Sequence, residues 1–246
     1  MRRVLRIELS ARAKSYLQKR QASANAKLRD GTLSIQTAWD SARQTKSMGD
    51  VLQALHSMMG PRQRCMYCMD SHGSDIEHFR PKNGFPRRMF RWRNLLLCCT
   101  ECGRMKGSQF PCQGTSPLLI DPTKEDPWNH LDFDPITGNI TARFEAGAAA
   151  FSPKGMETST LLQLDRREAL AAGYIKTYRR LIYLINSFLD SPTSSGQLVI
   201  SLLDEDEHGL VGWLFKGTGQ IEPIPTQLRR DHPLVWADCV RDLTYF

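Results

Sequence analysis

The chain has 246 residues, 41% of them hydrophobic, so it can bury a core and form one large domain or one domain with a helical addition. Its seven cysteines are odd in number and four lie in close pairs, which argues against a disulfide framework and for a reducing compartment. The net charge of +7 favours an anionic partner, and without a signal-peptide pattern or a run of ~20 apolar residues we expect a cytoplasmic protein with no membrane partner.

The first 61 residues are predicted to form an N-terminal helical region. Helices are expected over about 11–27 and 34–59, the second with a break near Gly49. Gly60 followed by Pro61 is a stop signal for the second helix. We find no chemistry in these helices and expect them to pack against the rest of the chain or to contact a partner.

Residues 62–135 are the most informative part, because two Cys-x-x-Cys pairs bracket a short acidic segment. The four cysteines are Cys65, Cys68, Cys99 and Cys102. Each pair can give two thiolates to one tetrahedral zinc ion, which would be structural because four protein ligands leave no open position. The 30 residues between the pairs (69–98) exceed the ~15–20 of compact zinc ribbons, so this insert must itself be folded. The alternative is a set of buried free thiols.

The segment Asp75-Ile-Glu77-His78 alternates polar and apolar residues and predicts a strand. Asp75 and Glu77 project to one face and His78 nominally to the other, so a twist or bulge would have to bring Glu77 and His78 to one site. A carboxylate that binds a hard metal ion, beside an imidazole that accepts a proton, is a minimal hydrolytic site. The alternatives are an ordinary surface pair for Glu77 and His78, and a turn cap for Asp75.

Basic residues are concentrated in the same part of the chain. Between residues 80 and 106 Glu101 is the only acid, whereas the bases are Arg80, Lys82, Arg87, Arg88, Arg91, Arg93, Arg104 and Lys106. We interpret this stretch as a surface that contacts phosphates, with Arg80 suited to a bidentate contact and Lys82 and Lys106 as further substrate-binding candidates. The alternatives are ion pairs or a solvated face.

Residues 136–246 are predicted to form a C-terminal, mainly helical region. A hairpin is expected where it begins, with 131–134 and 139–144 flanking a turn. A helix is predicted over 160–189, with Asp165 and Glu168 as a capping box. This helix and the N-terminal helices are candidate docking surfaces for a partner.

The order of these motifs resembles that of the HNH, or ββα-metal, nucleases with a zinc knuckle. The matching strings are the two Cys-x-x-Cys pairs, Asp-Ile-Glu-His-Phe-Arg-Pro-Lys from residue 75, Trp-Arg-Asn-Leu-Leu-Leu from residue 92, Lys106-Gly107 and Phe110-Pro111. More narrowly, they resemble the PtuB-type HNH proteins of Septu and retron-associated anti-phage systems, over roughly residues 62–135. The resemblance implies an α+β protein in which a zinc-stapled ββα-metal module is embedded in a mainly helical frame.

The resemblance also implies a role for each matching residue. His78 stands where the family has its general base, Glu77 where a carboxylate binds a catalytic Mg²⁺ or Mn²⁺, and Asn94 where an asparagine holds the loop and orients His78. Directly after the last cysteine, where the family has Asn or His as a second metal ligand, this chain has Gly103. Either Asp75, a water or another residue replaces that ligand, or metal binding is weakened, or the site is inactive.

We therefore expect a metal-dependent HNH endonuclease that hydrolyses phosphodiester bonds, with DNA favoured over RNA, as the effector of an anti-phage complex. The resemblance implies an ABC-type ATPase partner, since this chain has no Gly-x-x-x-x-Gly-Lys-Ser/Thr phosphate loop of its own. A retron RNA–DNA complex is a further implied partner. The rival interpretation is a zinc-knuckle nucleic-acid-binding or scaffold subunit with a decayed nuclease site, which Gly103 favours and the retention of His78, Glu77 and Asn94 disfavours.

Overall fold

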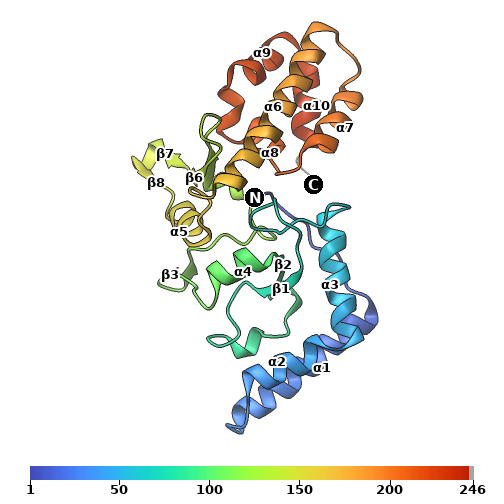
Figure 1. Ribbon diagram of the computed structural model, residues 1–246, viewed down its shortest axis with the longest axis vertical. Coiled ribbons are helices and arrows are strands. Elements are labelled where there is room, and N and C mark those ends of the chain that lie inside the picture. The colour runs from blue at the N-terminus through green and yellow to red at the C-terminus, as the bar shows by residue number, and fades with distance from the viewer. Residues whose placement is uncertain (244–246) are drawn as a thin grey trace. The chain divides into compact units, whose positions relative to one another are not determined.

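Three helices precede the first strand. In the computed structural model, which describes residues 1–243, they are α1 (Ala11–Arg29), α2 (Ile35–Arg43) and α3 (Lys46–Met59) (Figure 1). The helical segment predicted over 34–59 is interrupted as expected, but the break lies at Gln44 and Thr45 instead of near Gly49. A new helix starts there because the Thr45 hydroxyl accepts a hydrogen bond from the backbone N–H of Met48. Gly60 ends α3 with a φ of 74°, which confirms the stop signal.

A β-hairpin followed at once by a helix forms the centre of the cysteine-bracketed segment. Strand β1 (Asp75–His78) pairs antiparallel with β2 (Leu95–Cys98), so that Asp75 lies opposite Cys98 and His78 opposite Leu95. Helix α4 (Thr100–Lys106) follows β2 after a single residue. Every residue of β2 is buried, whereas in β1 only His78 is buried. The structure thus contains the ββα element that the motif order predicts.

The core beside this element is built largely by the N-terminal helices. Leu17 of α1, Trp39 of α2 and Val51 of α3 are buried in one cluster with Phe90 and Leu95. Burying a side chain of this kind contributes roughly 1.5–3 kcal/mol, so the three helices hold the hairpin and its loop in place.

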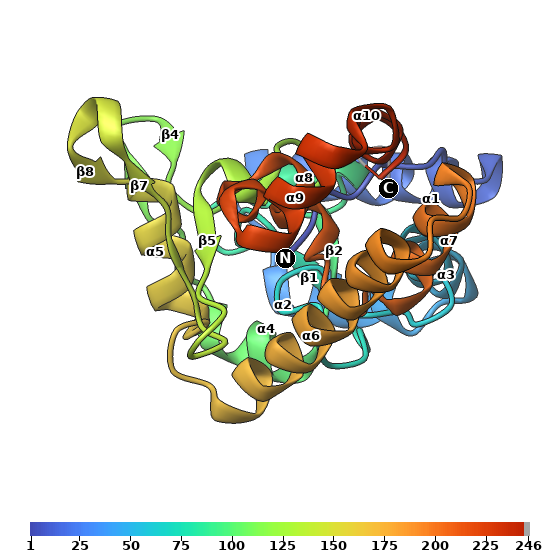
Figure 2. The same ribbon diagram turned by 90° about the horizontal axis from the view of Figure 1, so that it is seen from above.

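The rest of the chain combines short hairpins with helices. The paired strands are β3 (Cys112–Gln113) with β4 (Ser116–Pro117), β5 (Leu131–Phe133) with β6 (Ile140–Ala142), and β7 (Phe144–Glu145) with β8 (Ala150–Phe151). The helices are α5 (Pro153–Leu162), α6 (Glu168–Asp190), α7 (Ser195–Glu205), α8 (Val211–Lys216), α9 (Pro223–Asp231) and α10 (Pro233–Asp242). Helix α6 packs against α7 and α9, and α10 packs against the same two helices (Figure 2).

The β5–β6 pair confirms the predicted hairpin, whereas the helix predicted over 160–189 is confirmed only from Glu168 onward. It is divided between α5 and α6, because Gln163 adopts a left-handed conformation with a φ of 50° that ends α5. Helix α6 begins at Glu168 with Arg167 at its N-cap and no side-chain cap. Asp165 does not cap it, since its carboxylate instead accepts hydrogen bonds from the neighbouring Arg166 guanidinium.

The described residues form two compact units. One comprises Met1–Leu5, Tyr67–Asp70 and the residues from Gln113 onward, and the other comprises Arg6–Met66 and Ser71–Cys112. The α+β class predicted from the sequence is confirmed, with small antiparallel sheets among many helices. The division into functional regions at 61/62 and 135/136 stays a prediction. Among residues 1–243, no helix combines the length and the apolar character needed to cross a membrane.

Candidate functional site

The four paired cysteines form one buried cluster. The sulfur atoms of Cys65, Cys68, Cys99 and Cys102 all lie within 4.8 Å of one another. Cys99 also caps α4, because its Sγ accepts a hydrogen bond from the backbone N–H of Cys102 at 3.4 Å. Zn–S bonds of about 2.3 Å in a tetrahedron place sulfurs about 3.8 Å apart, so the cluster suits such an ion. The group can therefore hold a structural metal ion, as the spacing predicts.

The other three cysteines lie outside this cluster. Cys98 is buried on β2 with its Sγ 4.0 Å from that of Cys65, and the contacts with Cys65 and Cys99 together with burial raise the pKa of its thiol. Cys112 is exposed, and Cys239 is buried in the C-terminal helices.

Glu77 on β1 is the acidic centre of the candidate site. Its Oε1 accepts hydrogen bonds from the Lys106 ammonium at 2.9 Å and from the backbone N–H of His78 at 2.9 Å. The Lys106 side chain is fully buried, whereas 19% of the Glu77 side chain is exposed. Burial raises the pKa of the Glu77 carboxyl, and the Lys106 ammonium opposes this shift. Lys106 is thus a partner of Glu77 and lies away from the exposed basic surface in which the sequence placed it.

A cavity of about 550 Å³ opens beside Glu77. Its lining includes Trp39, Arg43, Asp75, Glu77, Gly103 and Arg104. A Cβ atom added at Gly103 would lie 3.7 Å from Oε2 of Glu77, so this second carboxylate oxygen faces α4 at the glycine. No backbone atom would clash there, and a side chain at position 103 has room.

Asp75 shares the cavity with Glu77 but contacts other groups. Its carboxylate accepts weak hydrogen bonds from the hydroxyls of Ser74 at 3.4 Å and Thr100 at 3.5 Å, and lies 3.7 Å from the Arg43 guanidinium. The structure therefore brings Asp75 and Glu77 to one face of β1, as the strand alternation predicts.

His78 lies on the other face of β1, buried in the core. Its Nε2 is 3.0 Å from the backbone carbonyl of Met89, and its ring meets that of Trp39 edge-on with centroids 4.3 Å apart. Burial lowers the pKa of His78 to about 3, so the imidazole is neutral at pH 7. A neutral ring next to a carbonyl must donate from Nε2, which leaves Nδ1 as the atom that can accept a proton.

Asn94 closes the long loop between β1 and β2. Its Oδ1 accepts from the backbone N–H of Arg80 at 2.9 Å, and its Nδ2 donates to the carbonyls of Arg80 at 3.0 Å and Arg88 at 3.1 Å. The side chain is buried. It therefore fixes the loop that presents the Met89 carbonyl to His78.

The predicted phosphate ligands differ in their surroundings. The Arg80 guanidinium stacks over the rings of Phe85 and Phe110, at 5.1 and 4.9 Å from their centroids. Lys82 is half-buried and its charge contributes to the lowered pKa of His78. The exposed bases are Arg87, Arg88, Arg91, Arg93 and Arg104. Arg80 and Lys82 thus adjoin the hairpin, whereas the exposed arginines form the outer basic surface.

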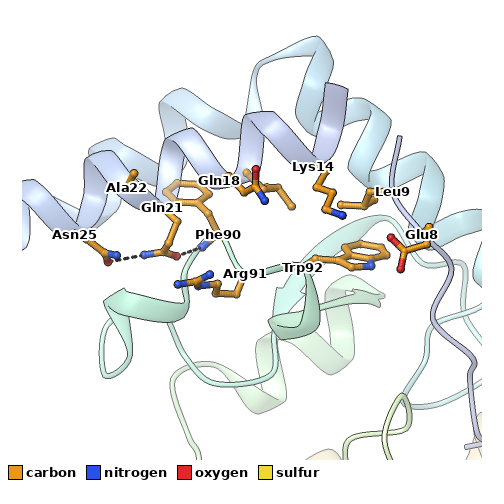
Figure 3. A pocket seen from close by; sticks show the side chains of 11 residues that line it. Glu8, Leu9, Lys14, Gln18, Gln21, Ala22, Asn25, Phe90, Arg91 and Trp92 are labelled. Carbon is orange, nitrogen blue, oxygen red and sulfur yellow. Dashed lines mark hydrogen bonds between the residues drawn. The ribbon is translucent and has the colours of Figure 1, made fainter. Parts of the chain in front are cut away.

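A second cavity, of about 310 Å³, lies between α1 and the loop, and Figure 3 shows Gln21 there, linked by hydrogen bonds to Asn25 and Phe90. Gln21 is buried; its Oε1 accepts from the N–H of Phe90 at 2.8 Å, and its Nε2 donates to the carbonyl of Pro86 at 3.1 Å. Trp92, at the opposite wall, donates from its indole to the carbonyl of Ile7 at 3.2 Å. Gln21 therefore holds the loop from the side of α1.

Sequence reasoning missed several residues of the site. Trp39 against His78 and Arg43 near Asp75 come from α2, in a part of the chain where we found no chemistry. The Met89 carbonyl is a backbone group, so its contact with His78 has no signature in the sequence. Lys106 and Glu77 were each found from the sequence, but the ion pair between them was not.

The fold and this arrangement define an α+β protein with a ββα element and a four-cysteine group that can hold a metal ion. No protein-family model matches the chain. It is 27% identical over 147 residues to a Septu protein PtuB from Bacillus thuringiensis, covering 55% of this chain and 52% of that protein. A Septu protein PtuB from Bacillus mycoides (strain KBAB4) is 31% identical over 136 residues, covering 43% of this chain and 44% of that protein.

A segment similar to this chain also occurs in a protein named Septu protein PtuA from Bacillus mycoides (strain KBAB4). It is 28% identical over 134 residues, covering 42% of this chain and 18% of that protein. The chain spans about half the length of the PtuB relatives it matches. The resemblance to PtuB proteins that the motifs indicate is thus confirmed over about half of the chain.

Proposed function

We propose that this chain is a metal-dependent HNH endonuclease that hydrolyses phosphodiester bonds in nucleic acid, as the nuclease subunit of a Septu-like anti-phage defence complex in the cytoplasm. The similarity to two proteins named Septu protein PtuB supports the class. The observation that carries the proposal is the ββα element, in which adjacent residues of one strand supply a cavity-facing carboxylate and a neutral imidazole. We take DNA as the first substrate to test and RNA as the second, since the basic surface suits either.

The catalytic ion would be held by Glu77. The residues present fit Mg²⁺ or Mn²⁺ only if water and substrate phosphates supply most of the other ligands. Mg²⁺ commonly keeps several waters and binds through one or two carboxylates together with substrate phosphates. Oε2 of Glu77 faces an open cavity, and Asp75 lines the same cavity as a second candidate oxygen ligand. When bound, the ion neutralises charge on the phosphate and favours ionisation of an attacking water.

The other residues have roles that follow from their contacts. His78 would accept a proton at Nδ1, because the Met89 carbonyl holds the proton at Nε2. Asn94 would hold the loop so that this tautomer and ring position persist. Arg80 and Lys82 would contact phosphates beside the hairpin. A structural Zn²⁺ in the four-cysteine cluster would fix the start of α4 relative to the segment that carries Cys65 and Cys68.

We infer that the nuclease works with a second Septu component. The occurrence of a similar segment within a protein named Septu protein PtuA supports such a link. An ABC-type ATPase is the partner that the motif resemblance implies, and a retron RNA–DNA complex is a further candidate. Nucleic acid is the expected substrate in either arrangement.

The test is a cleavage assay with the purified zinc-loaded chain, alone and with its ATPase partner. Plasmid DNA and total RNA are incubated with Mg²⁺, Mn²⁺ or EDTA, beside the variants His78→Ala and His78→Gln. Glutamine can still donate to the Met89 carbonyl but is no base, so it separates loss of chemistry from loss of packing. Metal-dependent cleavage that both variants abolish at unchanged zinc content is expected, whereas equal cleavage by His78→Gln would refute the assigned base.

A second candidate function is a zinc-knuckle nucleic-acid-binding or scaffold subunit without catalysis. The pairing of Glu77 with a buried lysine favours it, because that carboxylate already has a cation, and Gly103 supplies no ligand. This alternative predicts nucleic-acid binding by the chain with no cleavage of DNA or RNA under any of the metal conditions, even with the partner present.

A further inference from the structure

The two carboxylate oxygens of Glu77 have different surroundings, and this difference determines how an ion can bind. Oε1 is occupied by the Lys106 ammonium and by the backbone N–H of His78, both at 2.9 Å. Oε2 lies on the side of Gly103, where an added Cβ atom would be 3.7 Å from Oε2 and 3.8 Å from Sγ of Cys98, and all three residues line the cavity. An ion in the cavity therefore meets one oxygen of a carboxylate that is already held in place from behind.

The charge of the cavity does not attract a cation by itself. Lys106 is fully buried against Glu77 and neutralises it, so the pair adds no net negative charge. Asp75, the other acid of the lining, lies 3.7 Å from Arg43, and Arg104 lines the same cavity. Counting these groups, three bases face two acids. A divalent ion would thus enter a region that is already slightly positive, and this is unfavourable unless an anion enters with it.

The supply of protein ligands is equally sparse. Within residues 1–243 the four-cysteine cluster is the one group of three or more His, Cys, Asp or Glu side chains placed to hold an ion. At Glu77 most coordination positions must therefore be filled by water or by oxygens of the substrate. Phosphate oxygens are hard ligands suited to Mg²⁺ and Mn²⁺, and they bring the negative charge that the cavity lacks.

We propose that the divalent ion and a nucleic-acid phosphate bind this cavity as coupled ligands, each raising the affinity for the other, because Lys106 neutralises Glu77 and Gly103 adds no ligand. This proposal rests on the proposed function and adds how the nuclease would acquire its divalent ion. Lys106 is a positioning residue: it orients Glu77 and keeps the free site from holding a divalent ion tightly. The coupling is reciprocal, since binding free energies are linked.

The test measures ion binding directly. The zinc-loaded His78→Gln chain is used because it should not cleave the oligonucleotide. It is titrated with Mn²⁺, and the electron paramagnetic resonance signal of free Mn²⁺ reports the unbound ion. Titrations are run without oligonucleotide, with a thymidine octamer, and with the same octamer carrying uncharged methylphosphonate linkages. The octamer without protein and the Glu77→Gln chain correct for ions bound elsewhere. The charged octamer is expected to tighten Mn²⁺ binding by about tenfold or more, and the uncharged octamer to leave it unchanged.

Two pairs of variants, made in the same background, test the stated cause. Lys106→Gln keeps a donor to Glu77 but removes the charge, so it should bind Mn²⁺ more tightly without oligonucleotide and show weaker coupling. Gly103→Asn adds an oxygen ligand on the open side of Oε2, with Gly103→Ala as the control that adds bulk alone. Asn is chosen over His because it does not compete for zinc at the neighbouring cysteines. Gly103→Asn should tighten oligonucleotide-free binding, and Gly103→Ala should not.

The outcomes separate this inference from the proposed function. Tight Mn²⁺ binding without oligonucleotide, together with cleavage by the chain that keeps His78, would overturn the coupling and leave the nuclease standing. Coupling that survives Lys106→Gln and Gly103→Asn unchanged would overturn the cause assigned to it. Failure to bind Mn²⁺ even with the charged octamer, together with no cleavage, would overturn both.

Discussion

Replacing Asn94 by alanine is the sharpest test of how the loop before β2 is held. The change removes three hydrogen bonds and leaves the N–H of Arg80 and the carbonyls of Arg80 and Arg88 without these partners. Each unsatisfied backbone group costs about 1–3 kcal/mol, and these groups are only partly buried, so the low end applies. The expected loss is about 3 kcal/mol of local stability.

Hydrogen exchange followed by mass spectrometry reads this loss where it occurs. The amide of Phe79 donates to the Asn94 carbonyl at 2.8 Å, so it and its neighbours should exchange about a hundredfold faster in Asn94→Ala, since each 1.4 kcal/mol is a factor of ten. Asn83→Ala, at an exposed position in the same loop, is the matched control and should change stability by no more than about 0.5 kcal/mol. Acceleration below about fivefold in Asn94→Ala would show that the side-chain bonds do not hold the loop.

Three further outcomes are expected. Gln21→Ala should lower the free energy of unfolding, measured with urea, by about 3 kcal/mol, because it leaves the N–H of Phe90 and the carbonyl of Pro86 without these partners. Gln18→Ala, at an exposed position in the lining of the same cavity, should lower it by less than about 0.5 kcal/mol. Cys65→Ser should lower the zinc content measured by mass spectrometry, whereas Cys98→Ser, outside the cluster, should retain it; equal loss in both would contradict the four-cysteine assignment. Burial works against ionisation of Glu125, but its hydrogen bonds with His130 and Lys154 lower its pKa from 4.5 to about 2. This stabilisation is full above pH 4.5 and is lost as the pH falls towards 2, so the urea midpoint should drop over that window more in the natural chain than in Glu125→Gln.

Features encoded by neighbouring residues could be predicted from the sequence. The cysteine pairs, the alternating strand at 75–78 and the hairpin at 131–142 depend on spacing over a few residues, and the structure contains all three. Helix boundaries were less certain where two signals competed. Gly49 lies inside α3 without breaking it. The helix starts just after Thr45 instead, because the Thr45 hydroxyl caps the N-terminus of α3.

The contacts that define the candidate site could not be predicted, because they join distant segments. Lys106 and Glu77 are 29 residues apart, and their meeting depends on how α4 packs against β1. The sequence shows Lys106 as one base in a basic stretch, and burial alone turns it into an internal counter-ion. His78 likewise owes its neutral state to burial, in which Trp39 of the distant helix α2 covers its ring, and no motif can contain that contact.

The hydrogen bonds of Gln21 have a mechanical consequence. The N–H of Phe90 donates a hydrogen bond to Gln21, and the carbonyl of the preceding residue, Met89, accepts one from His78. Both hydrogen bonds therefore involve the same rigid peptide plane. A rotation of that plane to follow α1 would withdraw the carbonyl from the imidazole and release the proton on Nε2 to move. A displacement of helix α1, which contacts no proposed reactant, would therefore be transmitted through this one peptide to the imidazole of His78, the proposed base.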